Sequence, residues 1–165
     1  MLASLGLMLK GGKTMLLVCA FVVGVVAGLR AMMAPAVVSW FARTGFLAVG
    51  GTPLAFMGYK YTPVIFTLLA LGELVNDKLP KTASRKTPPQ FIGRVLTGAL
   101  SGATVGAAGH SLVVGLLLGA VGAVAGTLGG AAVRGKLATA FGRDIPAALI
   151  EDVAAIAIAV FAVLE

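Results

Sequence analysis

Long apolar runs, separated by short charged stretches, dominate the sequence. A helix needs about 20 apolar residues to cross a bilayer. Five runs approach or exceed that length, and they cover residues 14–43, 61–79, 90–108, 111–141 and 145–164. The pattern therefore predicts an all-α fold, a polytopic transmembrane helix bundle of about five spans that forms one domain over residues 1–165.

Two of the predicted segments, 14–43 and 111–141, are longer than a bilayer requires. At about 1.5 Å per residue each would measure about 45 Å, so each must tilt, kink or protrude. Arg30 and Pro35 interrupt the first segment, and we expect Pro35 to kink it. If the chain instead turns back near Arg30, the number of segments becomes six.

A shorter apolar stretch lies between the first two segments, at residues 46–58. It has 13 residues and contains Gly50, Gly51 and Pro53. Because this length is too short to span a bilayer as a helix, we expect a re-entrant or an interfacial loop.

The composition is typical of a membrane protein. Hydrophobic residues make up 59% of the chain and charged residues 12%, against about a quarter charged in soluble domains. The net charge of +7 would suggest nucleic acid as the partner of a soluble protein. In a membrane protein, the commoner cause is cationic cytoplasmic loops beside anionic lipid, so we expect membrane lipids as partners and no nucleic acid. Cys19 is the only cysteine, so an intrachain disulfide cannot form.

Cations are distributed unevenly between the two sides that five spans would define. Ten fall on the side of the N-terminus, and only Arg43 and Lys60 fall on the other. The positive-inside rule then predicts a cytoplasmic N-terminus and a cytoplasmic loop at residues 77–89, with Glu165 outside. The ten cations are Lys10, Lys13, Lys78, Lys81, Arg85, Lys86, Arg94, Arg134, Lys136 and Arg143.

Glycines recur at four-residue spacing, which aligns them on one face of each predicted helix. Missing side chains let helices approach closely, and in lipid such packing is a main source of association. These faces could pack within the chain or form the contact of a homo-oligomer. We favour packing within the chain for most of them, and we also expect a homo-oligomer. The glycines assigned to helix packing are Gly24, Gly28, Gly98, Gly102, Gly106, Gly122 and Gly126.

Two similar sextets suggest a weak internal repeat, VGVVAG at residues 23–28 and VGAVAG at residues 121–126. The repeat units would be residues 14–79 and 111–164, joined by the helix at 90–108. One segment lies between them, so the units would have inverted orientations, as in many transporters. Helices rich in Gly and Ala also match by chance, so duplication is an open hypothesis.

Two further blocks of sequence are distinctive. The first reads GLRAM at residues 28–32, followed by APA at 34–36, and the second reads ELVNDKLPKT at 73–82, followed by Ser84 and Arg85. These blocks resemble the signature of a bacterial family of small polytopic membrane proteins that is known only as a domain of unknown function. The family has no assigned activity. The resemblance therefore implies a fold and a multi-pass location in the bacterial inner membrane, but no function.

The candidate site residues are ionisable groups inside apolar segments. Arg30 lies near the middle of its segment, where a lone cation costs a few kcal/mol or more and so needs a partner. It could bind an anion or a phosphate headgroup, or form an ion pair with Glu73 between the first two segments. Glu151, together with Glu73, could belong to a proton path. The predicted substrate-binding residues are Arg30, Glu73 and Glu151.

A cluster of four cations follows the second segment directly, namely Lys78, Lys81, Arg85 and Lys86. Such clusters attract anionic lipid headgroups by about 1 kcal/mol per cation. The simpler alternative is a positive-inside anchor with no specific ligand. We retain headgroup binding as the predicted role.

Signals for enzyme chemistry are weak, so we expect no enzyme, no cofactor and no metal. The GGKT at residues 11–14 resembles the end of a P-loop but lacks the earlier glycine and the preceding strand. His110 is the only histidine. The predicted function is translocation of a small or lipid-linked anionic solute, by a transporter, flippase or channel-like protein. The alternative is a structural or assembly subunit of a membrane complex, with no transport activity.

Overall fold

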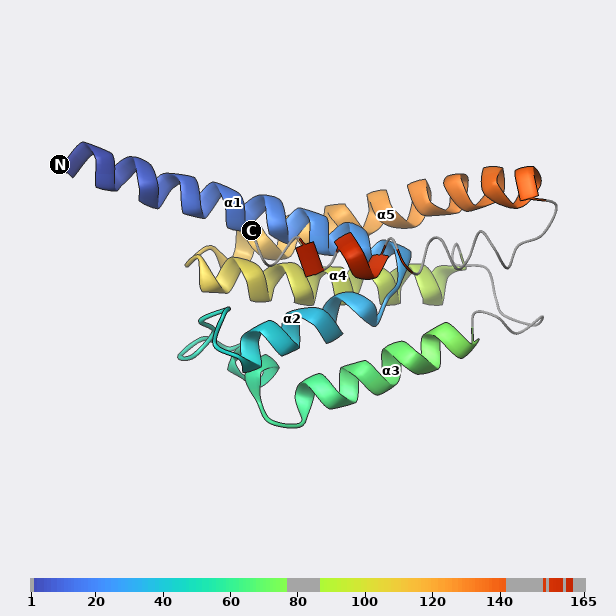
Figure 1. Cartoon of the computed structure of the whole chain (residues 1–165), viewed down its shortest axis with the longest axis horizontal. Helices are drawn as coiled ribbons and strands as arrows, with labels where there is room; N and C mark the ends of the chain where they lie inside the picture. The colour runs from blue at the N-terminus through green and yellow to red at the C-terminus, as the bar shows by residue number, and fades with distance from the viewer. Residues whose placement is uncertain (1, 77–86, 142–152, 154, 159, 162–165) are drawn as a thin grey trace.

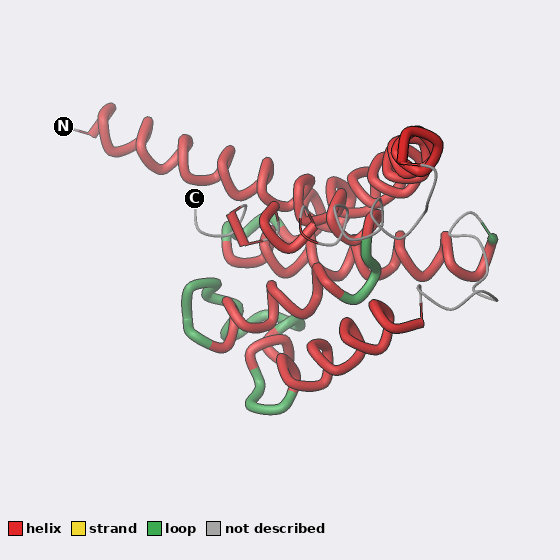
Figure 2. Tube along the Cα trace, turned by 45° about the vertical axis from the view of Figure 1, so that its right-hand side comes forward, coloured by secondary structure: helices red, strands yellow, loops and turns green. Residues whose placement is uncertain are grey.

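The computed structural model describes residues 2–76, 87–141, 153, 155–158, 160 and 161. Every regular element in this part of the chain is a helix, which confirms the all-α prediction (Figures 1 and 2). The described residues of the fifth predicted segment are helical too. The elements are α1 (Leu2–Leu29), α2 (Met33–Arg43), the short 3-10 helix η1 (Ala55–Gly58), α3 (Thr62–Asn76), α4 (Pro88–Ala108) and α5 (Leu112–Phe141).

The chain turns back at Arg30. Figure 1 shows α1 and α2 running in opposite directions on either side of this residue. The first predicted segment is therefore two helices, and the alternative with a reversal near Arg30 is the one that the structure has. The expected kink at Pro35 is wrong, because Pro35 lies in the first turn of α2. A proline is tolerated there, since the first N–H groups of a helix have no partner within the helix.

This reversal sets which helix ends lie together. Arg94, near the start of α4, contacts the carbonyl of Leu29 at the end of α1, and Gly109, just past the end of α4, lies against Leu16 of α1. We call the end of the bundle where α1 ends, α2 begins, α3 ends and α4 begins the Arg30 end. We call the opposite end, with residues 44–61, the loop end.

The predicted topology is wrong in one respect. It placed the N-terminus and the 77–89 loop on the same side. In the structure α1 begins at the loop end. The end of α3 at Asn76 and the start of α4 at Pro88, on either side of the loop, both lie at the Arg30 end (Figure 1). The reason is the additional helix α2, which reverses the direction of every element after it.

Helices α1, α4 and α5 pack backbone against backbone at glycines. A Cβ atom added to Gly24 would overlap the carbonyl of Gly119, and one added to Gly28 would overlap that of Ala123. On α4, an added Cβ at Gly102 would likewise overlap the backbone of α5. Contacts of this kind, all within the chain, involve each of the predicted packing glycines: Gly24, Gly28, Gly98, Gly102, Gly106, Gly122 and Gly126.

The two similar sextets lie on α1 and α5 and pack against each other. Gly24 meets Gly119 and Gly28 meets Ala123, so residue numbers rise together along both helices and the pair is parallel. The predicted inversion is therefore wrong for these helices, again because the chain reverses at Arg30. Two GxxxG-like sequences in a parallel pair suit a close contact between glycine faces. Whether the similarity reflects duplication stays a prediction.

Two described helices are long and apolar enough to cross a bilayer, α4 and residues 112–136 of α5. The apolar parts of α1 and α3, Thr14–Leu29 and Thr62–Asn76, are shorter. The outer surface of the bundle is strongly apolar, and monomeric soluble proteins rarely expose large apolar patches. Among the exposed side chains are Val18, Ile65, Leu68, Leu71, Ile92, Leu96, Val113, Leu117, Val121 and Leu128.

Candidate functional site

The reversal between α1 and α2 leaves backbone groups that no helix satisfies. The last carbonyls of α1 have no intrahelical partners, as at any helix end, and the N–H groups of Ala31 and Met32 belong to the turn that precedes α2. These groups lie inside the bundle, where an unsatisfied backbone group costs several kcal/mol. Side chains from α3, α4 and α5 provide the missing partners. We call residues 28–32, together with Glu73 and Arg94, the capped break.

Arg94 of α4 caps the end of α1. Its Nη1 donates to the carbonyl oxygens of Gly28 and Leu29, at 2.9 and 2.6 Å. Thr127 of α5 adds a longer hydrogen bond from Oγ1 to the Gly28 carbonyl, at 3.3 Å. The Arg94 side chain is 3% exposed. A cation at this position is favourable, because the carboxyl end of a helix carries partial negative charge.

Glu73 of α3 caps the start of α2. Its Oε1 accepts a hydrogen bond from the N–H of Ala31 and its Oε2 accepts one from the N–H of Met32, both at 2.8 Å. Each carboxylate oxygen thus satisfies one backbone donor. An anion is favourable here, because the amino end of a helix carries partial positive charge.

The two caps also contact each other. Arg94 Nη2 lies 3.5 Å from Glu73 Oε1, and the two side chains are 3% and 14% exposed. The hydrogen bonds of Glu73 and Arg94 to backbone groups are shorter than the distance between the two charged groups. The arrangement neutralises a buried cation with a nearly buried anion and holds α3 and α4 against the break.

Arg30 itself has a different position from the predicted one. The cation that the structure places beside Glu73 is Arg94, and the reversal brings the N–H groups that follow Arg30 to the same carboxylate. The Arg30–Glu73 pair stays a prediction. The Arg30 side chain is 1% exposed and does not line the cavity described next.

A cavity of about 430 Å³ lies beside the capped break. Apolar and small residues of α3 form one wall, and the first two turns of α4 form the other. Glu73 and Arg94 both border it, so the two charges of the capped break face a space that a small molecule could enter. The lining residues are Ala31, Met32, Leu68, Leu69, Gly72, Glu73, Asn76, Gln90, Gly93 and Arg94.

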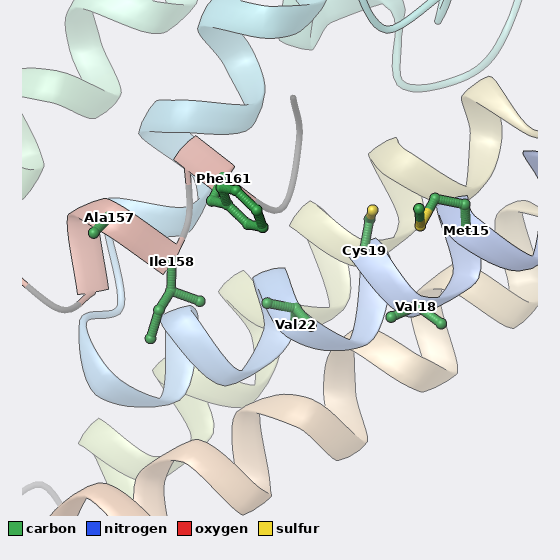
Figure 3. A pocket seen from close by; sticks show the side chains of 7 residues that line it. All are labelled: Met15, Val18, Cys19, Val22, Ala157, Ile158 and Phe161. Carbon is green, nitrogen blue, oxygen red and sulfur yellow. The ribbon is translucent and has the colours of Figure 1, made fainter. Parts of the chain in front are cut away.

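A second cavity, of about 610 Å³, lies between α1 and the described helical residues near the C-terminus. Figure 3 shows its two walls, one from α1 and one from the helical residues near the C-terminus, with the ring of Phe161 between them. Every described side chain that lines it is apolar or weakly polar, so the described lining offers no group that would orient a polar ligand. Its residues are Met15, Val18, Cys19, Val22, Ala157, Ile158 and Phe161.

Several predicted site residues lie outside the described part of the chain. They are Glu151 and the four cations assigned to lipid headgroups, Lys78, Lys81, Arg85 and Lys86. Of the predicted substrate-binding residues, Arg30 and Glu73 are described, and the structure brings Glu73 to the cavity.

Sequence reasoning assigned Arg94 only to the cytoplasmic cations and so missed its role. The sequence does contain an indication of this role, which is the position of Arg94 relative to the glycines of α4. Arg94 precedes Gly98, Gly102 and Gly106 at the same four-residue spacing, which places it on the face of α4 that packs against α1 and α5. A cation on a packing face is buried, and a buried cation needs acceptors.

Over the described residues, no three His, Cys, Asp or Glu side chains lie close enough together to hold a metal ion. No protein-family model matches the chain, and neither a curated protein nor a solved structure matches it. The resemblance of the GLRAM and ELVNDKLPKT blocks to a bacterial membrane family therefore stays a prediction.

Proposed function

We propose that the protein is a membrane carrier for a small anionic solute, which binds in the cavity beside the capped break. One observation carries the proposal: the chain reverses between α1 and α2 at buried backbone groups, and the charged side chains that cap this turn border a cavity. In many secondary transporters, solutes bind at the ends of discontinuous helices, where backbone groups and dipole ends face the ligand, and the adjoining ends of α1 and α2 offer groups of this kind.

Glu73 would act in this carrier as an internal substitute for the solute. Its carboxylate occupies the N–H groups of Ala31 and Met32 and lies near the Arg94 guanidinium. A carboxylate or phosphate group of a solute presents the same acceptor geometry. We therefore expect solute and Glu73 to compete for these donors, and the displacement of Glu73 to loosen the contact between α3 and α2.

The charge distribution supports an orientation opposite to the one expected from five spans. The sequence that follows α3 and precedes α4, and the end of α5 with the residues after it, connect to the Arg30 end and carry seven cations. The loop end and the start of α1 carry four, Lys10, Lys13, Arg43 and Lys60. The positive-inside rule then favours a cytoplasmic Arg30 end, with the N-terminus outside, in a bacterial inner membrane.

The test is ligand-induced thermal stabilisation of the purified protein in detergent. The probes are acetate, benzoate, inorganic phosphate and glycerol phosphate, and separately micelles that contain phosphatidic acid, which distinguish a free anion from a lipid headgroup. We expect at least one anion to raise the melting temperature of the wild type and of Arg43→Gln, whose arginine is exposed at the loop end. Arg94→Gln should lose this response.

Folding of Arg94→Gln is checked by far-ultraviolet circular dichroism, and Arg94→Lys retains the charge if the glutamine variant fails to fold. The lysine cannot donate to two carbonyls and an anion with the geometry of a guanidinium, so its response should be weakened. A wild type that no anion stabilises, or an Arg94→Lys variant that responds as strongly as the wild type, would refute the anion site.

One set of observations favours the alternative, a structural or assembly subunit. In the capped break, Arg94 Nη1 and both carboxylate oxygens of Glu73 already have backbone partners, and much of the outer surface is apolar. A subunit of this kind would bind protein or lipid on its outer face and no solute. A null result in the thermal assay, combined with stable co-purification of a second membrane protein, would support it.

A further inference from the structure

All tryptophan and tyrosine residues of the chain lie in one segment at the loop end. Trp40 is in the last turns of α2, and Tyr59 and Tyr61 precede α3. Together with Phe46 and Phe56 they are exposed, from 38% for Phe56 to 67% for Tyr61. We call residues 40–61 the aromatic segment.

The underside of the aromatic segment is fixed to the bundle. Leu47, Val49 and Met57 are buried in the same apolar core as α1 and α2. The segment folds back on α2, because Gly58 lies close enough to the Ala42 carbonyl that an added Cβ would come within 3.1 Å. Thr62 donates to the Phe56 carbonyl at 2.7 Å, which satisfies one of the loop's acceptors. The aromatic side chains therefore extend outward from a fixed base.

The exposed rings combine an apolar body with polar or charged neighbours. Trp40 Nε1 donates to Thr67 Oγ1 at 3.1 Å, and Lys60 Nζ lies 5.4 Å from the centre of the Tyr61 ring. Tryptophan and tyrosine concentrate at membrane–water interfaces for this reason, since the ring prefers the lipid and the polar tip prefers the headgroups. Arg43 and Lys60 at the same end can approach phosphate groups.

The lengths of the helices agree with a position of the aromatic segment at the membrane–water interface. Helix α4 has 21 residues, about 31 Å, close to the thickness of the hydrocarbon core. Its carboxyl end lies at the loop end with the aromatic segment (Figure 1). If Tyr61 is at one interface, Leu71 on α3 lies about 15 Å deeper, near the middle of the bilayer.

From these observations we infer that the aromatic segment lies in the headgroup region of the membrane and anchors the loop end there. Of the two alternatives expected for residues 46–58, a re-entrant and an interfacial loop, this inference favours the interfacial one. Its buried apolar side chains pack on the bundle, and its exposed aromatic side chains contact lipid. The partner is a phospholipid surface. The inference does not depend on the solute or on transport.

The test uses a single tryptophan at position 61, in the variant Trp40→Phe/Tyr61→Trp, in phospholipid vesicles. Position 61 is chosen because Trp40 donates to Thr67, which lies about 9 Å deeper than Tyr61 along α3. Lipids brominated near the glycerol backbone should quench this variant more strongly than lipids brominated near the ends of the acyl chains. The matched control is Trp40→Phe/Leu71→Trp, which moves the tryptophan to an exposed position on α3. Its order of quenching should be reversed.

Stronger quenching of the Trp40→Phe/Tyr61→Trp variant by the deeper bromines would overturn the inference and would indicate a re-entrant loop. Quenching by aqueous iodide with no effect of any brominated lipid would overturn it as well, because the aromatic side would then face water. Failure of every brominated lipid to quench the Leu71→Trp control would show that α3 does not lie in the bilayer, and would refute the depth argument.

Discussion

Replacement of Glu73 by alanine tests whether its carboxylate holds the break between α1 and α2. The change removes two hydrogen bonds of 2.8 Å from backbone N–H groups and also removes the carboxylate that lies 3.5 Å from the buried Arg94 guanidinium. Hydrogen bonds to a charged group contribute about 1.5–3 kcal/mol each. Breaking one side of a buried ion pair costs about 3–5 kcal/mol. Because these losses overlap, we expect Glu73→Ala to lower the free energy of unfolding by about 3–5 kcal/mol.

Arg94→Ala and the double variant complete the cycle. Arg94 retains hydrogen bonds to Gly28 and Leu29 when Glu73 is absent, and Glu73 retains those to Ala31 and Met32 when Arg94 is absent. Most of each loss is therefore independent of the other side chain. The coupling should be about 1–3 kcal/mol, smaller than either single loss.

The assay is unfolding in mixed micelles by titration with SDS, followed by circular dichroism. Arg43→Ala is the matched control, because Arg43 is exposed at the loop end, and it should change stability by no more than about 0.5 kcal/mol. A loss below about 1 kcal/mol for Glu73→Ala would show that the carboxylate does not hold the break. Strict additivity of the two single variants would show that the ion pair contributes nothing.

Two further predictions concern packing and topology. Gly24→Ala should destabilise by about 1–3 kcal/mol, because its Cβ would overlap the backbone of Gly119. Gly129→Ala, where an added Cβ meets nothing within 4 Å, should instead stabilise by about 0.5–1 kcal/mol in the same SDS titration; equal effects would contradict the packing. In a Cys19→Ala background, single cysteines at Gly12 and Thr44 should be labelled by a membrane-impermeant thiol reagent from the same side of the membrane, because the start of α1 and the end of α2 both lie at the loop end. Labelling from opposite sides would contradict the reversal at Arg30.

Local patterns in the sequence predict the helices and several of their contacts. Long apolar runs predict helices because a chain in lipid must satisfy its backbone hydrogen bonds internally. The predicted segments 90–108 and 111–141 match α4 and α5 within two residues at each end. Four-residue glycine spacing placed the faces where α1, α4 and α5 approach, since a helix without side chains on one face can be approached closely. These properties are local, and local patterns suffice for them.

The path of the chain at Arg30 and the residues of the capped break depend on how distant helices pack together. The local sequence permits a continuous helix with a kink at Pro35 as well as a new helix that starts just before it. The reversal exposes carbonyls and N–H groups that must find partners, and these come from 42 positions away in the case of Glu73 and 66 in the case of Arg94. No periodicity within one segment can indicate such a partner. The pairing depends on how α3 and α4 pack around the break. The same packing sets the orientation of the helices in the membrane, the parallel arrangement of α1 and α5, and the cavity.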